Sequence, residues 1–264
     1  MATVAVIGAG SCGIALSKVL HSNGNQVTVW SIVEDEIAML REKHEHLQKL
    51  PGVKLPENMT FTTDLKAAVE SGKYLSLAVP SVFTRSTAKS MAPFVKNGQV
   101  IVCVAKGIEE TTLMTLSDIV EQEIPQAEVA VMCGPSHAEE VGIGLPTTVV
   151  AGAKKRKVAE GIQDIFMNSV FRVYTSPDVL GMELGGSLKN VIALAAGMAD
   201  GLGYGDNTKA ALITRGMFEM SKPMIRSGIF FSPRTRPSAL TAAMPGAASG
   251  SSGRQNARLR RPKT

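Results

Sequence analysis

A strand that runs directly into closely spaced glycines is the feature that most constrains this fold. The apolar residues 4–7 are followed by Gly8, Gly10 and Gly13. At this spacing the first glycine allows a tight turn, the second lets a pyrophosphate approach the backbone, and the third lets the next helix pack against the strand. The N-terminus of that helix, predicted over residues 14–22, offers free N–H groups and a positive dipole end to phosphates.

A glycine-rich turn without a ligand is the plainer reading of this spacing. The context favours a dinucleotide site, because the glycines lie between a strand and a helix and a second strand is predicted at residues 26–30. Strands and helices then continue to alternate. Strands are predicted at 74–79, 100–104, 128–133, 147–151 and 171–175, and helices at 34–48, 84–94, 112–121 and 155–167. This alternation predicts an α/β fold with a Rossmann-like, mostly parallel sheet that helices cover on both faces.

Polar or glycine-rich loops follow three of these strands, at residues 80–81, 106–107 and 134–136. Each loop alone is more often an ordinary turn. Because parallel strands end at one edge of the sheet, we expect all three to open beside the glycine turn and form a site there. Ser136 is also a candidate N-cap for a helix that begins near Ala138.

The pattern changes after residue 177. Residues 181–201 and 207–225 read as helices with no strand between them, and the first is rich in glycine and alanine. Glycine costs about 1 kcal/mol inside a helix, so several in one helix indicate close packing or a close ligand. We therefore predict a dinucleotide-binding domain over residues 1–177, a helical domain over 178–231 and a disordered basic tail over 232–264.

The charge is unevenly placed. No Asp or Glu follows Glu219, whereas nine Lys and Arg do, so the net charge of +5 becomes −4 for the rest, where 19 basic residues stand against 23 acidic ones. A basic tail can bind nucleic acid, but only Phe230 and Phe231 supply aromatic rings, so we predict no nucleic-acid partner.

Other features point to a cytoplasmic protein. No apolar stretch reaches the ~18 residues that span a bilayer, and the N-terminus reads as a strand, so neither a membrane span nor a signal peptide is predicted. The three cysteines, Cys12, Cys103 and Cys133, have unrelated spacings. They predict reduced thiols, and neither a disulfide framework nor a metal site.

Five motifs occur in an order that one enzyme family shares: GAGSCG at 8–13, KGIE at 106–109, GPSHAEE at 134–140, GGSLKNVIA at 185–193 and NTKAALITRG at 207–216. With them the chain resembles bacterial NAD(P)-dependent glycerol-3-phosphate dehydrogenases from about residue 3 to residue 220. The resemblance implies reduction of dihydroxyacetone phosphate to sn-glycerol 3-phosphate with NAD or NADP, a step that feeds glycerophospholipid synthesis. It also implies a small-molecule partner and allows a homodimer.

The resemblance assigns roles to single residues. Lys189 falls at the position of the proton-transferring lysine. The substrate-binding candidates are Lys106, Gly134, Ser136, Lys189 and Asn190, and the cofactor-binding candidates are Gly8, Gly10, Ser11, Cys12, Gly13, Ser31, Lys106 and Ala138; no metal is expected. Chemistry supports the lysine, because hydride attack on a ketone builds negative charge that a nearby cation stabilises. A lysine on a helix is otherwise most often a solvated surface charge, and Lys106 alone reads as a loop charge.

Two departures from the family concern the cofactor. Cys12 stands where the family commonly has an aromatic residue. The second strand ends at Ser31, without the acid that would bind a ribose hydroxyl and without an arginine for a 2′-phosphate, so use of both dinucleotides is expected.

A third departure concerns the C-terminus. The family's Gly-Asp-Leu and Ser-Arg-Asn segments are missing, and the composition shifts near residues 220–231. We hypothesise that a shifted reading frame or a premature end leaves the all-α domain incomplete, which sequencing of the coding DNA tests. The two helices should then expose apolar faces, and a homodimer would be weakened.

Three functions therefore remain open. The first is the dehydrogenase itself. The second is a non-catalytic dinucleotide-binding remnant of it. The third is a β-hydroxyacid dehydrogenase-like reductase, against which the loops at 106–107 and 134–136 argue.

Overall fold

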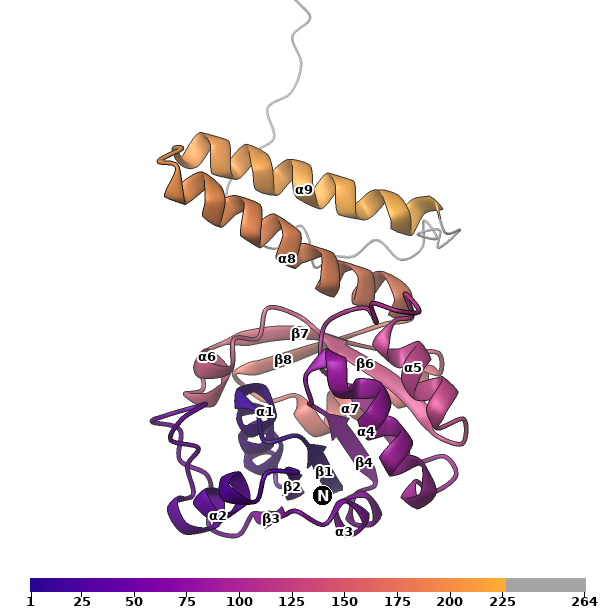
Figure 1. The fold of residues 1–264 in the computed structure, drawn as a ribbon. Coiled ribbons are helices and arrows are strands. Elements are labelled where there is room, and N and C mark those ends of the chain that lie inside the picture. Colours follow the sequence, from indigo (N-terminus) through magenta and orange to yellow (C-terminus); the bar gives the residue numbers. More distant parts are fainter. Residues whose placement is uncertain (227–264) are drawn as a thin grey trace, which may run out of the picture. The chain divides into compact units, whose positions relative to one another are not determined.

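The computed structural model describes the structure of residues 1–226 of the 264-residue chain. One sheet organises it (Figure 1), with the strand order β3-β2-β1-β4-β5-β6-β7-β8. The strands are β1 Thr3–Ile7, β2 Gln26–Trp30, β3 Thr60–Thr62, β4 Tyr74–Leu77, β5 Val100–Cys103, β6 Glu128–Cys133, β7 Thr147–Ala153 and β8 Phe171–Ser176. The predicted α/β class with a mostly parallel, Rossmann-like sheet is confirmed.

One strand pair differs from the rest. All neighbouring strands are parallel except β6 and β7, which pair antiparallel with Cys133 opposite Val150. Just after β6, an added Cβ on Gly134 would come within 2.8 Å of the Thr148 carbonyl oxygen, so glycine allows the close approach of β6 and β7.

The helices of the described residues are α1 Ser11–Ser22, α2 Glu34–Lys43, α3 Leu65–Ser71, α4 Thr84–Met91, α5 Leu116–Glu123, α6 Ala138–Gly142, α7 Arg156–Phe166, α8 Val179–Gly201 and α9 Asp206–Arg226, with 3₁₀ turns at Ser81–Phe83 and Ala92–Phe94. The predicted helix over 34–48 is too long, because His44 adopts a left-handed φ of 49° and ends α2. The predicted helix over 112–121 starts too early, because Thr115 caps α5 by accepting from the Asp118 N–H.

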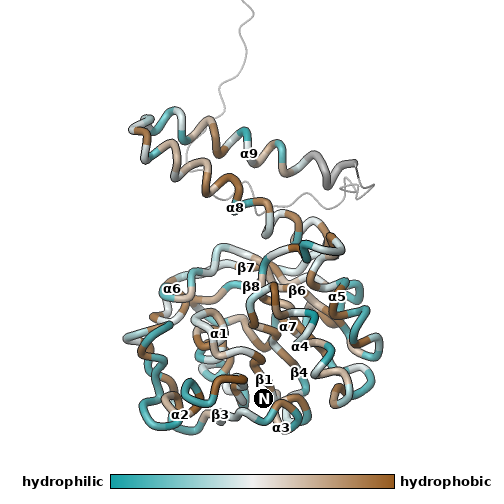
Figure 2. Tube along the Cα trace, in the orientation of Figure 1, coloured by the Kyte–Doolittle hydropathy of each residue, from teal (hydrophilic) through white to brown (hydrophobic). Residues whose placement is uncertain are grey.

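The core lies on both faces of the sheet. Along β1, Val4 and Val6 belong to one apolar cluster, whereas Ala5 and Ile7 belong to the other. This alternation is the two-residue period of a strand, and here both faces are apolar because helices cover both. Figure 2 shows the central strands in the brown of apolar residues. The sheet is thereby a rigid base for the loops at its carboxyl edge.

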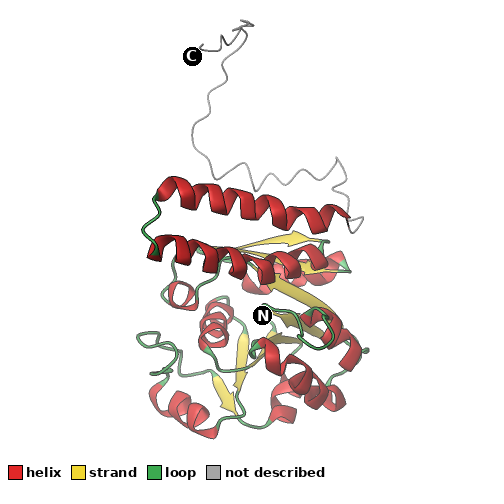
Figure 3. Cartoon of the chain, turned by 45° about the horizontal axis from the view of Figure 1, so that its top comes forward, coloured by secondary structure: helices red, strands yellow, loops and turns green. Residues whose placement is uncertain are grey.

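Beyond the sheet, α8 and α9 lie side by side (Figures 1 and 3). Asp178 caps α8, since its carboxylate accepts from the Gly181 N–H at 2.8 Å. Large apolar side chains of both helices are exposed, among them Val191, Leu194, Met198, Ile213 and Met217. The expected exposure of their apolar faces is confirmed. The predicted division at residues 177 and 178 falls between β8 and α8 and stays a prediction, and the predicted tail lies outside the described residues.

Within residues 1–226, α8 is long and apolar enough to cross a membrane by length and composition. The expectation that no segment has membrane-spanning length is therefore wrong on that criterion. The first turns of α8, however, pack against β6 and β7. Its Glu183 carboxylate is buried and accepts hydrogen bonds from Ser117 of α5. These contacts anchor the first turns of α8 to the sheet and to α5, as in a helix of the same folded unit.

Candidate active site

Each glycine of the first turn meets a different structural requirement. Gly8 has a φ of +119°, which favours glycine, and its N–H donates to the Trp30 carbonyl at 2.9 Å. A Cβ on Gly13 would lie 2.0 Å from the Gly8 carbonyl oxygen, so only glycine fits between α1 and the turn. A Cβ on Gly10 would meet no atom within 4 Å. Gly10 therefore leaves open space at the N-terminus of α1, as a bound pyrophosphate requires.

A cavity of about 800 Å³ lies at the carboxyl edge of the sheet, beside this turn. Segments far apart in the sequence line it. The lining residues are Gly10, Ser11, Cys12, Ala78, Val79, Pro80, Ser81, Val104, Ala105, Lys106, Gly134, Pro135, Ser136, His137, Ala138, Glu139, Glu140 and Lys189. The structure thus brings together eight of the candidate residues from the sequence: Gly10, Ser11, Cys12, Lys106, Gly134, Ser136, Ala138 and Lys189. The three loops predicted to share this edge do so.

Four candidates lie outside the cavity wall. Gly8 and Gly13 shape the turn beneath it. Ser31 is buried at the end of β2, where its hydroxyl donates to the Glu36 carboxylate at 2.7 Å. Asn190 is exposed, and its side-chain oxygen accepts from the Lys189 ammonium at 3.2 Å.

The Lys106 loop is held from two sides. Gly107 has a φ of +149°, and a Cβ there would lie 2.9 Å from the Ser81 Cβ. Further along, the Glu109 carboxylate accepts two hydrogen bonds from the Arg85 guanidinium, at 2.8 and 2.7 Å. The Arg85 pair, with a smaller effect of Thr112, lowers the pKa of Glu109 from about 4.5 to about 2. The loop is thereby fixed beside α4, with Lys106 on the cavity wall.

The loop after β6 differs from the sequence prediction. Ser136 is not the N-cap of α6, since His137 occupies that position and no side chain caps the helix. The Ser136 hydroxyl instead lies 3.5 Å from the Gly134 carbonyl oxygen. The prediction failed because α6 begins at Ala138, so its N-cap is the residue directly before it, and Ser136 lies one position too early; α6 is 5 residues long. The Ser136 side chain faces the cavity without a capping bond to the helix.

Lys189 reaches the cavity from α8. One turn before it, a Cβ on Gly186 would lie 3.4 Å from the Cys133 Sγ and 3.7 Å from the Lys106 Cγ. The helix therefore sits directly on the carboxyl end of β6. The Lys189 side chain is exposed, yet it lines the mouth of the cavity that includes the first glycine turn.

The pKa of the Cys133 thiol is affected by the charged groups around the mouth of the cavity. This pKa is raised, chiefly by burial and also by the Glu183 carboxylate, while Lys106 and Lys189 both oppose the rise. Two ammonium groups thus act on one thiol at the end of β6. Such an arrangement suits an anionic ligand with a carbonyl or hydroxyl group. All three cysteines are free thiols, as predicted.

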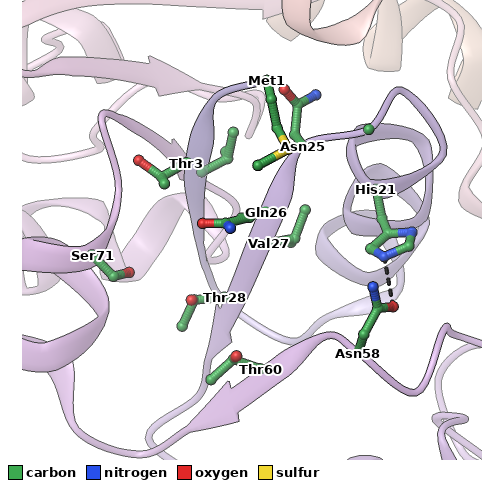
Figure 4. Close-up of a pocket in the computed structure, with 12 residues that line it drawn as sticks. Met1, Thr3, His21, Asn25, Gln26, Val27, Thr28, Asn58, Thr60 and Ser71 are labelled. Carbon is green, nitrogen blue, oxygen red and sulfur yellow. Dashed lines mark hydrogen bonds between the residues drawn. The ribbon is translucent and has the colours of Figure 1, made fainter.

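A second cavity, of about 580 Å³, lies at the opposite edge of the sheet (Figure 4). Thr3, Gln26, Val27 and Thr28 of β1 and β2 contribute to its wall, and the His21 Nε2–H donates to the Asn58 Oδ1 at 2.8 Å. Ligands of parallel sheets bind beyond the carboxyl ends of the strands, not the amino ends. This cavity is therefore not the candidate site.

Sequence reasoning missed two residues that support the site. Arg85 fixes the Lys106 loop, and Glu183 joins α8 to α5. Both act through partners 24 or more positions away, so neither belongs to a local motif. Among residues 1–226, no cluster of His, Cys, Asp and Glu is arranged to hold a metal ion.

The fold and the cavity together define a dinucleotide-binding protein of the Rossmann class. Comparison with known proteins gives the family. The model of the NAD-dependent glycerol-3-phosphate dehydrogenase N-terminus matches residues 3–159, and that of the C-terminus matches residues 178–235. The chain belongs to this NAD-dependent glycerol-3-phosphate dehydrogenase family, as its motifs suggested.

Individual relatives support the match. A glycerol-3-phosphate dehydrogenase [NAD(P)+] of Agathobacter rectalis is 74% identical over 228 residues, which cover 86% of this chain and 68% of the relative. That of Fusobacterium nucleatum is 53% identical over 230 residues, which cover 86% and 69%. The crystal structure of the Coxiella burnetii enzyme superposes with a TM-score of 0.81 at 34% identity and covers 86% and 70%. The chain thus spans about two thirds of the length of these proteins.

Proposed function

We propose that this chain interconverts dihydroxyacetone phosphate and sn-glycerol 3-phosphate with NAD(H) or NADP(H). The observation that carries the proposal is the single cavity in which Gly10, Lys106, Gly134 and Lys189 meet, in a member of this family. The residues fit the cofactor, because Gly10 leaves open backbone at the N-terminus of α1. The bound dinucleotide supplies or accepts the hydride at the central carbon of the substrate.

The residues of the chain divide the remaining tasks. The N–H groups at the start of α1 bind the pyrophosphate. Lys106 and Lys189 attract the anionic substrate, and Lys189 donates the proton that the carbonyl oxygen takes up when the carbon is reduced. In the reverse direction Lys189 accepts that proton. Gly134 and Ser136 line the substrate end of the cavity, and Asn190 hydrogen-bonds a substrate hydroxyl.

The proposal extends to setting and cofactor. The dehydrogenase acts in the cytoplasm, where free thiols persist, and its product feeds glycerophospholipid synthesis. Both NAD and NADP are accepted, since Ser31 at the end of β2 is neither an acid that would exclude a 2′-phosphate nor directly followed by an arginine that would bind one.

A second candidate function is dinucleotide binding without turnover. It is favoured by the exposed apolar side chains of α8 and α9, among them Leu194, Met198 and Met217. A helical layer that is open to water can bind the dinucleotide and still fail to enclose the substrate.

A steady-state assay of the chain as it stands separates these functions. NADH oxidation that depends on dihydroxyacetone phosphate supports the dehydrogenase. NADH binding without such oxidation supports the second candidate. NADH oxidation that depends on the oxo acid corresponding to a β-hydroxyacid, and not on dihydroxyacetone phosphate, would support the β-hydroxyacid dehydrogenase-like reductase. The family match otherwise argues against that alternative.

A further inference from the structure

A buried carboxylate joins α8 to the sheet domain. Glu183 is 7% exposed. Its Oε1 accepts from the Ser117 backbone N–H at 2.9 Å, and its Oε2 accepts from the Ser117 hydroxyl at 2.5 Å. Ser117 is in the first turn of α5, where backbone N–H groups have no partner within the helix. Glu183 lies on α8, 66 positions after Ser117, and thus caps α5 from a different helix.

This contact lies on the face of α8 that leads to the cavity. Glu183, Gly186 and Lys189 are spaced by three residues, so they follow one another around the helix surface, with Gly186 between Glu183 and Lys189, which are about 120° apart. Gly186 rests near the Cys133 thiol and the Lys106 side chain. Lys189, one turn further, lines the cavity. The bond at Glu183 therefore fixes the helix less than two turns before the proposed proton donor.

The other contacts of α8 with the sheet lie in its first turns, where Val179 and Met182 pack against the apolar core. Beyond Lys189, the side chains of Val191, Leu194 and Met198 are more than half exposed. The first turns, which pack against β6 and β7, carry the attachment. A rotation of the helix by one residue would turn Lys189 away from the cavity, because successive residues differ by about 100° around the axis.

The hydrogen bonds between Glu183 and Ser117 form in only one orientation of α8, unlike an apolar contact. Burying a carboxylate is unfavourable unless fixed donors satisfy it, and an apolar side chain would fill the same place without that penalty. An apolar residue, however, would not select one rotation of the helix. Both oxygens of Glu183 are instead matched to two donors of a single residue, which defines one orientation.

We propose that Glu183 is a positioning residue, which caps α5 and so sets the rotation of α8 that directs Lys189 into the cavity. The significance given to Lys189 rests on the proposed function, whereas the anchoring of α8 does not.

The test uses the full chain with Glu183→Gln and Glu183→Ala. Glu128→Gln is the matched control, since Glu128 lies at the amino end of β6 and pairs with Lys155 on the surface. Three quantities are measured: hydrogen exchange of the amides of residues 184–193, the Kd for NADH, and kcat and KM with dihydroxyacetone phosphate. For Glu183→Ala we expect at least tenfold faster exchange in α8, an NADH Kd within twofold of the parent, and a tenfold lower kcat.

Glu183→Gln should lie between the parent and Glu183→Ala, because its amide keeps one acceptor for Ser117. Ser117→Ala, which leaves the backbone donor in place, is the milder variant if either substitution at Glu183 prevents folding. It should raise exchange in α8 two- to fivefold. Combined with Glu183→Gln, it should add less than it does alone, because both remove the same hydrogen bond.

Three results would overturn the proposal: unchanged α8 exchange in every variant that folds, faster exchange with unchanged kcat, or an NADH affinity that falls in step with kcat. If the parent binds NADH but shows no turnover with dihydroxyacetone phosphate, the proposed function fails on its own. Exchange in α8 then decides the anchoring by itself, with faster exchange at constant NADH affinity in its favour.

Discussion

Large apolar side chains are buried in the sheet, whereas many are exposed to solvent in the helix pair α8–α9. In β1, β4 and β5, residues such as Val6, Leu75 and Ile101 are fully buried between two layers of helices. In α8, Leu194 and Met198 are more than half exposed. The sheet and its covering helices thus enclose an apolar core, which gives the loops at the carboxyl edge a rigid base. The helix pair depends on the few contacts of its first turns for the placement of Lys189.

The largest expected effect concerns the glycine turn, where fold and ligand binding can be separated. Gly13→Ala places a Cβ 2.0 Å from the Gly8 carbonyl oxygen, within the backbone, where no flexible side chain can yield. We expect a loss of more than about 4 kcal/mol of unfolding free energy, or no folded protein. Chemical denaturation measures it.

Gly10→Ala is the matched variant in the same turn. Its Cβ meets no atom of the chain within 4 Å, but it enters the space proposed for the pyrophosphate. The unfolding free energy should stay within about 0.5 kcal/mol of the parent. The Kd for NADH, measured by fluorescence, should rise at least tenfold. Parent-like NADH binding by Gly10→Ala would place the cofactor elsewhere.

The next effect compares the two regions directly. Ile101→Ala empties a fully buried position in β5 and should destabilise the protein by about 2–5 kcal/mol. Leu194→Ala removes a side chain that is 62% exposed on α8, and should change stability by less than about 0.5 kcal/mol. Both are read from urea unfolding. A loss at Leu194 as large as that at Ile101 would mean that another surface covers α8 in solution.

The smallest effect is the pH dependence of the Lys106 loop. The pKa of Glu109 is lowered to about 2 in the folded protein, mainly by Arg85, from an ordinary value near 4.5. Because the folded pKa is the lower one, the pair stabilises the fold above about pH 4.5, and this contribution is lost as the pH falls toward 2. Glu109→Gln and Arg85→Met should each flatten the fall in Tm over that window. Equal slopes in parent and variants would show that the pair does not contribute in solution.

The sequence was most informative where structure is local. Strand β6 was predicted with its observed bounds, and the roles of Gly8 and Gly13 follow from a spacing that has one structural solution. Short elements escaped detection: β3 has 3 residues and α6 has 5, too few for a periodic pattern. The end of α2 was missed because it depends on the backbone of His44, a residue that is not a usual helix terminator.

The loops that line the candidate site could be predicted from the sequence, whereas the contacts that hold these loops and α8 in place could not. Strand-end loops share one edge in any parallel sheet, so Lys106, Gly134 and Gly10 could be brought together in advance. The cap between Glu183 and Ser117 joins residues 66 positions apart and leaves no mark in either local sequence. The antiparallel pairing of β6 and β7 was not predictable from the alternation of strands and helices, which favours parallel neighbours.

The most direct test substitutes Lys189 by methionine, which keeps the unbranched side chain up to the ε position and removes the ammonium group. NADH binding and NADH oxidation with dihydroxyacetone phosphate are then measured on the parent and on Lys189→Met. We predict parent-like binding and an oxidation rate lower by a factor of about 100 or more, as expected for loss of a proton donor. Lys209→Met, on α9 and paired with Asp200, is the control and should oxidise NADH like the parent. An unchanged rate in Lys189→Met would contradict the assignment of the chemistry to α8.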